Sequence, residues 1–125
     1  MADTKIAVVT GASRGLGRSM ALALARKGVE VIGTYHSNQA EADATAAAIE
    51  ALGRKALMVR LDTGDTAGFA PFAAELGRVL AKQWGRGTFD FLVNNAGIGI
   101  AAPFAETTEA EFDRLMNIHL KGVFF

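Results

Sequence analysis

The feature that most constrains this chain is a glycine-containing turn at residues 10–17, Thr-Gly-Ala-Ser-Arg-Gly-Leu-Gly, placed between two regular segments. A short apolar run, residues 6–9, precedes it, and a helical run, residues 18–27, follows it. Glycines accept backbone angles that side chains forbid, and they let a ligand approach the main chain closely. The free N–H groups and the positive dipole end of the following helix favour an anion at the same spot. Strand, turn and helix in this order predict a pyrophosphate-binding turn.

The spacing of the glycines separates this turn from two common phosphate-binding motifs. Gly11, Gly15 and Gly17 form the pattern G-x-x-x-G-x-G, which differs from the dinucleotide fingerprint G-x-G-x-x-G. A Walker loop requires lysine directly after its second glycine, and neither Leu16 nor Arg18 meets that requirement. The alternative is a tight turn against a helix that binds no ligand, and the turn alone does not decide between the two.

Composition sets the class of protein. The chain has 125 residues, enough for one domain with a hydrophobic core, and half of its residues are hydrophobic. Its 13 basic and 13 acidic residues give zero formal net charge, and no block of like charge suggests a nucleic-acid or membrane partner. The absence of cysteine excludes disulfides and thiolate metal sites, and no metal is predicted. No apolar stretch approaches the ~18 residues of a membrane span, and the N-terminus is polar, so we expect a cytoplasmic protein.

Strand and helix patterns alternate along the chain. Short apolar strands are predicted at residues 5–10, 29–34, 56–61 and 89–93, with helices at 15–27, 39–52 and 67–84 and a last helix after residue 108. Asn38 with Glu41 and Thr108 with Glu111 have the spacing of helix N-terminal capping boxes. The alternation predicts an α/β, Rossmann-like parallel sheet in the order 3-2-1-4, with helices on both faces. The ligand crevice would open between strands 1 and 4.

The residues after the second strand bear on the choice of cofactor. In dinucleotide-binding domains an acid at this position holds both adenosine ribose hydroxyls and disfavours a 2′-phosphate. Here Tyr35, His36 and Ser37 follow the strand, and the first carboxylate, Glu41, lies inside the next helix. Arg14 in the glycine turn carries a permanent positive charge that could reach the same phosphate. The pattern favours NADP(H) over NAD(H), the alternative being that Arg14 and His36 are solvated surface residues.

The ends of strands 3 and 4 carry polar residues on the same edge of the predicted sheet. Asp62 and Thr63 end the third strand, where a carboxylate could accept from an adenine amino group or instead begin a turn. Asn94-Asn95-Ala96-Gly97 ends the fourth strand. Asparagine amides can hold neighbouring backbone groups, and the small residues Ala96 and Gly97 leave room for a flat ligand ring. An ordinary asparagine-glycine turn is the alternative.

The last helix combines an unusual polar residue with an apolar face. Asn117 interrupts the helical pattern, and asparagine is a poor helix former, so a hydrogen bond to a neighbouring loop is one explanation. The fourth strand would be an open edge of the sheet, and the helix would expose Leu120, Val123 and Phe124. Open edges and apolar faces favour pairing, so we expect self-association or dependence on a partner.

Taken together, the motifs at residues 10–17, 62–63, 94–97 and 116–122 resemble the N-terminal half of a classical short-chain dehydrogenase/reductase. The resemblance covers essentially the whole chain and is nearest to 3-ketoacyl-carrier-protein-reductase-like enzymes. It implies one NADP-binding Rossmann-like domain over residues 1–125, a truncated doubly wound fold, and homo-oligomers. The cofactor-binding residues implied or expected are Gly11, Ser13, Arg14, Gly15, Leu16, Gly17, Tyr35, His36, Ser37, Asp62, Thr63, Asn94, Ala96 and Gly97. Asn117 would belong to the catalytic tetrad and hold a water in a proton relay.

The resemblance has one large departure. Members of that family are about twice as long, and their catalytic serine and Tyr-x-x-x-Lys pair lie in the second half. Here the only tyrosine is Tyr35, and Gln39 stands where the lysine would be. A tyrosine with a pKa of about 10 needs a nearby cation to act as an acid near neutrality.

Three functions therefore compete. The first is the cofactor-binding part of an NADP-dependent oxidoreductase that reduces carbonyls or oxidises alcohols, inactive by itself. The second is a non-catalytic nucleotide-binding or self-associating fragment. The third is a flavodoxin-like signalling domain, which would need acids clustered at the strand ends, where Asp62 is the main one.

Overall fold

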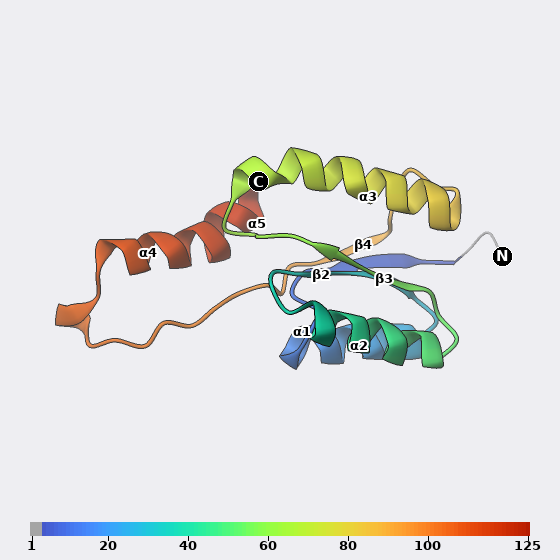
Figure 1. The fold of residues 1–125 in the computed structure, drawn as a ribbon, viewed down its shortest axis with the longest axis horizontal. Coiled ribbons are helices and arrows are strands. Elements are labelled where there is room, and N and C mark those ends of the chain that lie inside the picture. Colours follow the sequence, from blue (N-terminus) through green and yellow to red (C-terminus); the bar gives the residue numbers. More distant parts are fainter. Residues whose placement is uncertain (1–3) are drawn as a thin grey trace.

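Four short apolar segments pair into a parallel sheet in the order β3-β2-β1-β4, as the sequence predicts. The computed structural model describes residues 4–125 (Figure 1). The strands are β1 (Ile6–Val9), β2 (Glu30–Tyr35), β3 (Ala56–Arg60) and β4 (Phe91–Val93). In register, Val8 pairs with Ile32 of β2 on one side and with Leu92 of β4 on the other. The carboxyl ends of the strands therefore meet at one edge of the sheet.

The helices cover both faces of this sheet. α1 (Gly15–Arg26) and α2 (Gln39–Ala51) lie on one face, and α3 (Phe69–Trp84) lies on the other (Figure 1). Alternate residues of each strand point to opposite faces, so β1 contributes side chains to two hydrophobic cores, one on each face of the sheet. Ala7 and Val9 pack in the core with α1 and α2, whereas Ile6 and Val8 pack with Leu80 of α3.

Both predicted N-terminal caps are present, but in the box at α2 no bond from the Asn38 N–H to the Glu41 carboxylate accompanies the first bond. Asn38 Oδ1 accepts from the Glu41 N–H at the start of α2. Thr108 and Glu111 form a complete capping box at the start of α4 (Glu109–Met116). By contrast, no side chain among residues 4–125 caps α1, whose first turn leaves its backbone N–H groups directed at the sheet edge.

The last predicted helix contains a π-helical segment, Asn117–Lys121, between α4 and the short α5 (Gly122–Phe124). Two 3₁₀ turns, Thr66–Gly68 and Phe104–Glu106, precede α3 and α4. Together with the loop after β4, α4 extends well away from the sheet (Figure 1). Within residues 4–125, no helix is both long and apolar enough to span a bilayer.

Candidate functional site

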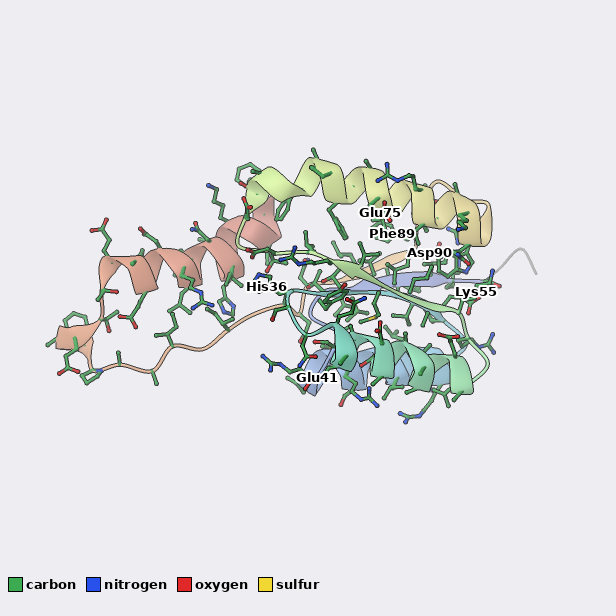
Figure 2. All side chains as sticks on the ribbon, in the orientation of Figure 1. His36, Glu41, Lys55, Glu75, Phe89 and Asp90 are labelled. Atoms are coloured by element: carbon green, nitrogen blue, oxygen red, sulfur yellow. The ribbon has the colours of Figure 1, made fainter. Side chains whose placement is uncertain are left out.

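A cleft opens at the carboxyl edge of the sheet and is bordered by the ends of all four strands. Its volume, about 560 Å³, is in the range of small-molecule sites. Figure 2 shows His36 at this end of the molecule and Lys55 and Asp90 at the other. The predicted residues that line the cleft are Gly11, Ser13, Arg14, Gly15, Leu16, Tyr35, His36, Ser37, Asp62, Thr63, Ala96 and Gly97.

Three predicted residues lie outside the lining of this cleft. Gly17 is buried beneath the turn, and Asn94 is exposed beyond the end of β4. Asn117 lines an adjoining cavity that shares His36 and Asp62 with the cleft. Most of the predicted site residues therefore line the cleft, and Gly17, Asn94 and Asn117 do not.

The three glycines of the turn serve two different purposes. A Cβ on Gly11 would lie 2.9 Å from Ala96 Cα, and one on Gly17 would collide with the Gly11 carbonyl and lie 2.5 Å from Asn95 Nδ2. Both glycines allow the turn to pack closely against the segment after β4. Gly15 has a φ of +57° and nothing within 4 Å of a Cβ position, so it alone combines the left-handed backbone with open space. Of these three glycines, Gly15 leaves the most open space beside the backbone, and the close approach of a ligand to the turn stays a prediction.

Asn95 and Thr10 join the glycine turn to the end of β4. Asn95 Nδ2 donates to the carbonyls of Thr10 and Gly11, both at 3.1 Å. Thr10 Oγ1 in turn accepts from the backbone N–H groups of Asn95 at 3.0 Å and Ala96 at 2.9 Å. These bonds fix the two sides of the cleft relative to each other.

The other side of the turn rests on α2 through a buried threonine. Thr45 is fully buried, and its hydroxyl donates to the Ser13 carbonyl at 3.1 Å. Arg18 Nη1 donates to the same hydroxyl at 2.9 Å. The Gly11 N–H is held by Thr34 Oγ1 at 3.2 Å, so the Thr34 hydroxyl supports the turn from beneath. The N-terminus of α1 is thus held from three elements while its first turn faces the cleft.

The β2 and β3 ends place an imidazole and a carboxylate together. His36 Nε2 lies 3.6 Å from Asp62 Oδ2, and both side chains are about half exposed. Asp62 Oδ1 accepts from the Gly64 N–H at 2.9 Å, so this residue both begins a turn and lines the cleft. The structure therefore confirms that Asp62 begins a turn, and its contact with an adenine amino group stays a prediction.

Four lining residues were not singled out from the sequence, namely Leu61, Ile98, Arg114 and Ile118. Thr34, Asn38 and Asn95 line the cleft too, and they were not in the predicted set of cofactor contacts. Position directly after a strand could have identified Leu61. Arg114 and Ile118 come from the last helix, and only the tertiary fold brings that helix over the cleft.

A strong ion pair at the opposite end of the sheet is separate from this cleft. Arg86 lowers the pKa of Asp90 to about 2, chiefly by hydrogen bonding to its carboxylate, and the Ile6 N–H bond lowers it further. Arg86 Nη1 also donates to the Thr4 carbonyl at 3.2 Å. This pair joins the beginning of β4 to the beginning of β1, far from the strands' carboxyl ends (Figure 2).

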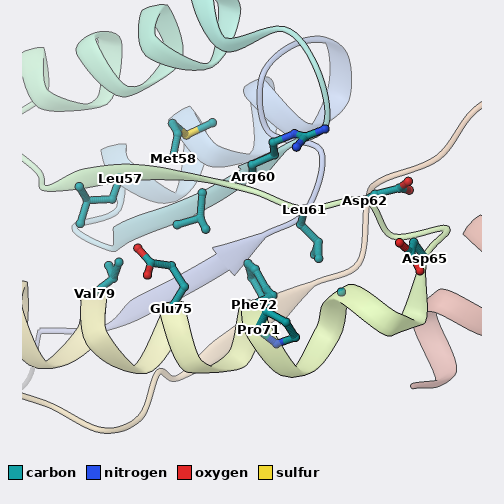
Figure 3. Close-up of a pocket in the computed structure, with 12 residues that line it drawn as sticks. Leu57, Met58, Arg60, Leu61, Asp62, Asp65, Pro71, Phe72, Glu75 and Val79 are labelled. Carbon is teal, nitrogen blue, oxygen red and sulfur yellow. The ribbon is translucent and has the colours of Figure 1, made fainter.

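A second hollow lies between β3 and α3 (Figure 3). Leu57, Leu61, Phe72 and Val79 give it an apolar lining, and Glu75 is the one acid that α3 contributes. Met58 and Arg60 point to the opposite side of β3 in Figure 3. In the part of the chain that the structure describes, no group of three His, Cys, Asp or Glu side chains is arranged to hold a metal ion.

Comparison with known proteins gives a consistent family. The sequence model described as "short chain dehydrogenase" matches residues 5–125. An uncharacterised oxidoreductase of Methylorubrum extorquens is 41% identical over 121 residues, which are 97% of this chain and 46% of the relative. Versicolorin reductase 1 of Aspergillus parasiticus is 34% identical over 123 residues, 98% of this chain and 45% of the relative.

Solved structures agree with the sequence relatives. The landomycin C-6 ketoreductase LanV with bound NADP and rabelomycin superposes with a TM-score of 0.92 at 36% identity, covering 97% of this chain and 49% of that protein. A short chain dehydrogenase from Burkholderia cenocepacia in complex with NADP gives 0.84 at 36% identity, covering 96% and 46%. The chain spans just under half the length of these relatives.

Proposed function

Because this chain belongs to the short chain dehydrogenase family, we propose that it forms the cofactor-binding part of an NADP-dependent oxidoreductase that interconverts carbonyl and alcohol groups. The observation that carries the proposal is the cleft itself. It joins the uncapped N-terminus of α1, Gly15 and the Asp62 carboxylate at one edge of a parallel sheet.

The residues present fit a nicotinamide dinucleotide. The first turn of α1 has no side-chain cap within residues 4–125 and no acid, so its N–H groups suit a pyrophosphate. Gly15 gives that anion access to the backbone, and Asp62 would accept from the adenine amino group. Ala96 and Gly97 would border the nicotinamide end. The bound nicotinamide supplies the hydride that such oxidoreductases exchange with a substrate carbon.

The preference for NADP(H) over NAD(H) rests on the charges beside β2. Arg14, His36 and Ser37 all line the cleft, and β2 ends in Tyr35 without a carboxylate. An exposed guanidinium can form two hydrogen bonds to a phosphate. Two structural relatives at 36% identity contain NADP, which supports the same choice.

Catalysis would need groups that this sequence lacks. Asn117 is proposed as the tetrad asparagine on the family resemblance, and its side chain makes no hydrogen bond with residues 4–125, so its amide can bind a water. Tyr35 lines the cofactor cleft and has no lysine four residues later. Residues 1–125 are therefore proposed to bind cofactor without turning over a substrate.

The cofactor assignment is tested by titrating NADPH and NADH against the chain and its Arg14→Ala variant. Loss of a charge-assisted contact costs about 1.5–3 kcal/mol, so NADPH should bind roughly 10- to 100-fold more weakly to the variant. Binding of NADH should change little, because it has no 2′-phosphate. Arg14→Lys is the matched control, since it keeps the charge and loses the two-pronged geometry. Equal losses for both cofactors, or tighter binding of NADH by the wild type, would refute the assignment.

A second candidate function is self-association, favoured by the exposed apolar side chains of the last helix. Leu120 is 64% exposed, Val123 48% and Phe124 79%, and β4 forms an open edge of the sheet. Such a surface favours pairing. Solution scattering over a range of concentrations tests it, and a monodisperse monomer at every concentration would exclude it.

A further inference from the structure

The imidazole of His119 contacts Gly97 and Ile98, two residues that line the cofactor cleft. His119 lies in the π-helical segment Asn117–Lys121, and its Nε2 reaches the loop after β4. The Ile98 N–H donates to Nε2 at 3.1 Å, and Nε2 is also 2.7 Å from the Ile98 carbonyl oxygen. Both backbone groups of one cleft-lining residue are therefore within reach of a single ring nitrogen.

The same ring explains why position 97 is a glycine. A Cβ on Gly97 would collide with His119 Cε1 and lie 3.2 Å from Nδ1 and 3.3 Å from Nε2. The space beside Gly97 that the sequence suggested for a ligand ring is, on this side, filled by a side chain of the protein. Gly97 and Ile98 are thus held between the cleft and the imidazole.

The same helical stretch also packs against the loop after β3. A Cβ on Gly122 would collide with the Thr63 carbonyl, and Ile118 Cγ1 lies 2.9 Å from the Cβ position of Gly64. Since β3 and β4 are the two edges of the sheet, the stretch contacts the loops that follow both edge strands. At the loop after β3 the contacts are close packing, whereas at the loop after β4 His119 provides a hydrogen bond.

We propose that His119 is a positioning residue, whose imidazole fixes Gly97 and Ile98 at the wall of the cleft so that the cleft is formed before the cofactor binds. This inference rests on the proposed function. An unprotonated Nε2 accepts from the Ile98 N–H, and a protonated Nε2 donates to the Ile98 carbonyl. Either arrangement keeps the ring on the loop. Preorganisation of this kind raises affinity because less freedom is lost on binding.

The experiment compares NADPH binding by the wild type, His119→Ala and His119→Gln in the chain of residues 1–125. Loss of the bond should weaken NADPH binding by roughly three- to tenfold in His119→Ala. Glutamine carries a donor and an acceptor at the reach of Nε2, so His119→Gln should recover most of that loss. Leu120→Ala is the matched control, because Leu120 belongs to the same segment and is exposed. It should bind NADPH as the wild type does.

Hydrogen exchange at the Ile98 amide provides a readout that needs no cofactor. The amide should be protected in the wild type and exchange faster in His119→Ala, while the amides of β1 stay unchanged. Unaltered exchange at Ile98, or unaltered NADPH affinity in His119→Ala, overturns the positioning role. A loss that His119→Gln does not recover also overturns it, because the side chain would then act only by filling space. Failure of the wild type to bind NADPH overturns the proposed function itself, a result that the variants do not produce.

Discussion

The two sides of the cofactor cleft are built in different ways. On one side, β1 and β2 are buried between the helix layers, and residues Ile6–Val9 are at most 1% exposed. On the other side, Phe91 and Leu92 of β4 are 46% and 54% exposed, and α4 contains no buried residue. The glycine turn belongs to the first region, and the loop at residues 94–98 belongs to the second.

This difference indicates what each side of the cleft depends on. The glycine turn is held by close backbone packing and by the buried Thr34 and Thr45 hydroxyls. The β4 loop is held by a few polar bonds from Asn95 and His119, with little apolar packing around them. Regions with few buried contacts open at lower free energy than the core. Changes at the turn should therefore act on global stability, and changes in the loop should act more locally.

The largest effect is expected at Gly17, where the turn is packed most closely. Gly17→Ala would place a methyl group against the Gly11 carbonyl and Asn95 Nδ2. Overpacking commonly costs about 1–3 kcal/mol, and a collision with backbone should reach the upper end or exceed it. Urea unfolding of the variant and the wild type measures the difference.

Gly77→Ala is the matched control for this prediction. Gly77 lies in α3 and has nothing within 4 Å of its Cβ position. Alanine there should stabilise the chain by about 0.5–1 kcal/mol, because glycine is costly inside a helix. If Gly17→Ala and Gly77→Ala unfold with equal free energies, the turn is not more closely packed than α3.

Asn95→Ala should have the next largest effect, because Asn95 joins the two regions. Its amide bonds to the Thr10 and Gly11 carbonyls would be lost, leaving partly buried acceptors without a partner. Such losses cost about 1–3 kcal/mol. Asn94→Ala is the control, since Asn94 is exposed and should change stability by less than about 0.5 kcal/mol. Equal effects in the two variants would mean that the amide bonds do not couple the regions.

The sequence predicts the buried region better than the exposed one, for a physical reason. Each of β1, β2 and β3 is a short apolar run bounded by turn residues, so pattern alone identifies it to within about a residue. Parallel pairing with crossover helices then determines the order 3-2-1-4. The first residue of β4 is Phe91, two residues later than expected, because Asp90 is bonded to the Ile6 N–H and Arg86.

Contacts between distant segments could not be read from local pattern. Glycine spacing predicted ligand contacts at Gly11 and Gly17, but it gave no sign that both also pack closely against the segment after β4. The adjacent residues Asn94 and Asn95 are identical in type, and only the fold shows that Asn95 points back to Thr10. The π-helical segment at Asn117–Lys121 likewise depends on packing against the ends of β3 and β4.

The smallest predicted effect concerns pH and the bond between the starts of β1 and β4. Asp90 has a pKa of about 2 in the folded chain against an ordinary value of 3.8, with the Arg86 hydrogen bond as the main cause. Because the folded pKa is lowered, the ionised Asp90 carboxylate stabilises the fold fully above pH ~4, and this stabilisation is lost as pH falls towards 2. Asp90→Asn should lower the melting temperature at pH 7, and its difference from the wild type should shrink as pH falls from 4 to 2. Thermal melts at pH 7, 5, 4, 3 and 2 measure the difference.

The control for the pH prediction is an exposed pair on α3. Glu75 Oε2 lies 2.7 Å from Arg78 Nη2, but this pair is three residues apart on one helix and joins no separate elements. Exposed pairs of this kind contribute little, so Glu75→Gln should change the melting temperature less than Asp90→Asn at pH 7. If the two variants melt alike at pH 7 and show the same dependence below pH 4, the bond at Asp90 does not anchor β4. The weakly packed side of the cleft would then depend on Asn95 and His119 alone.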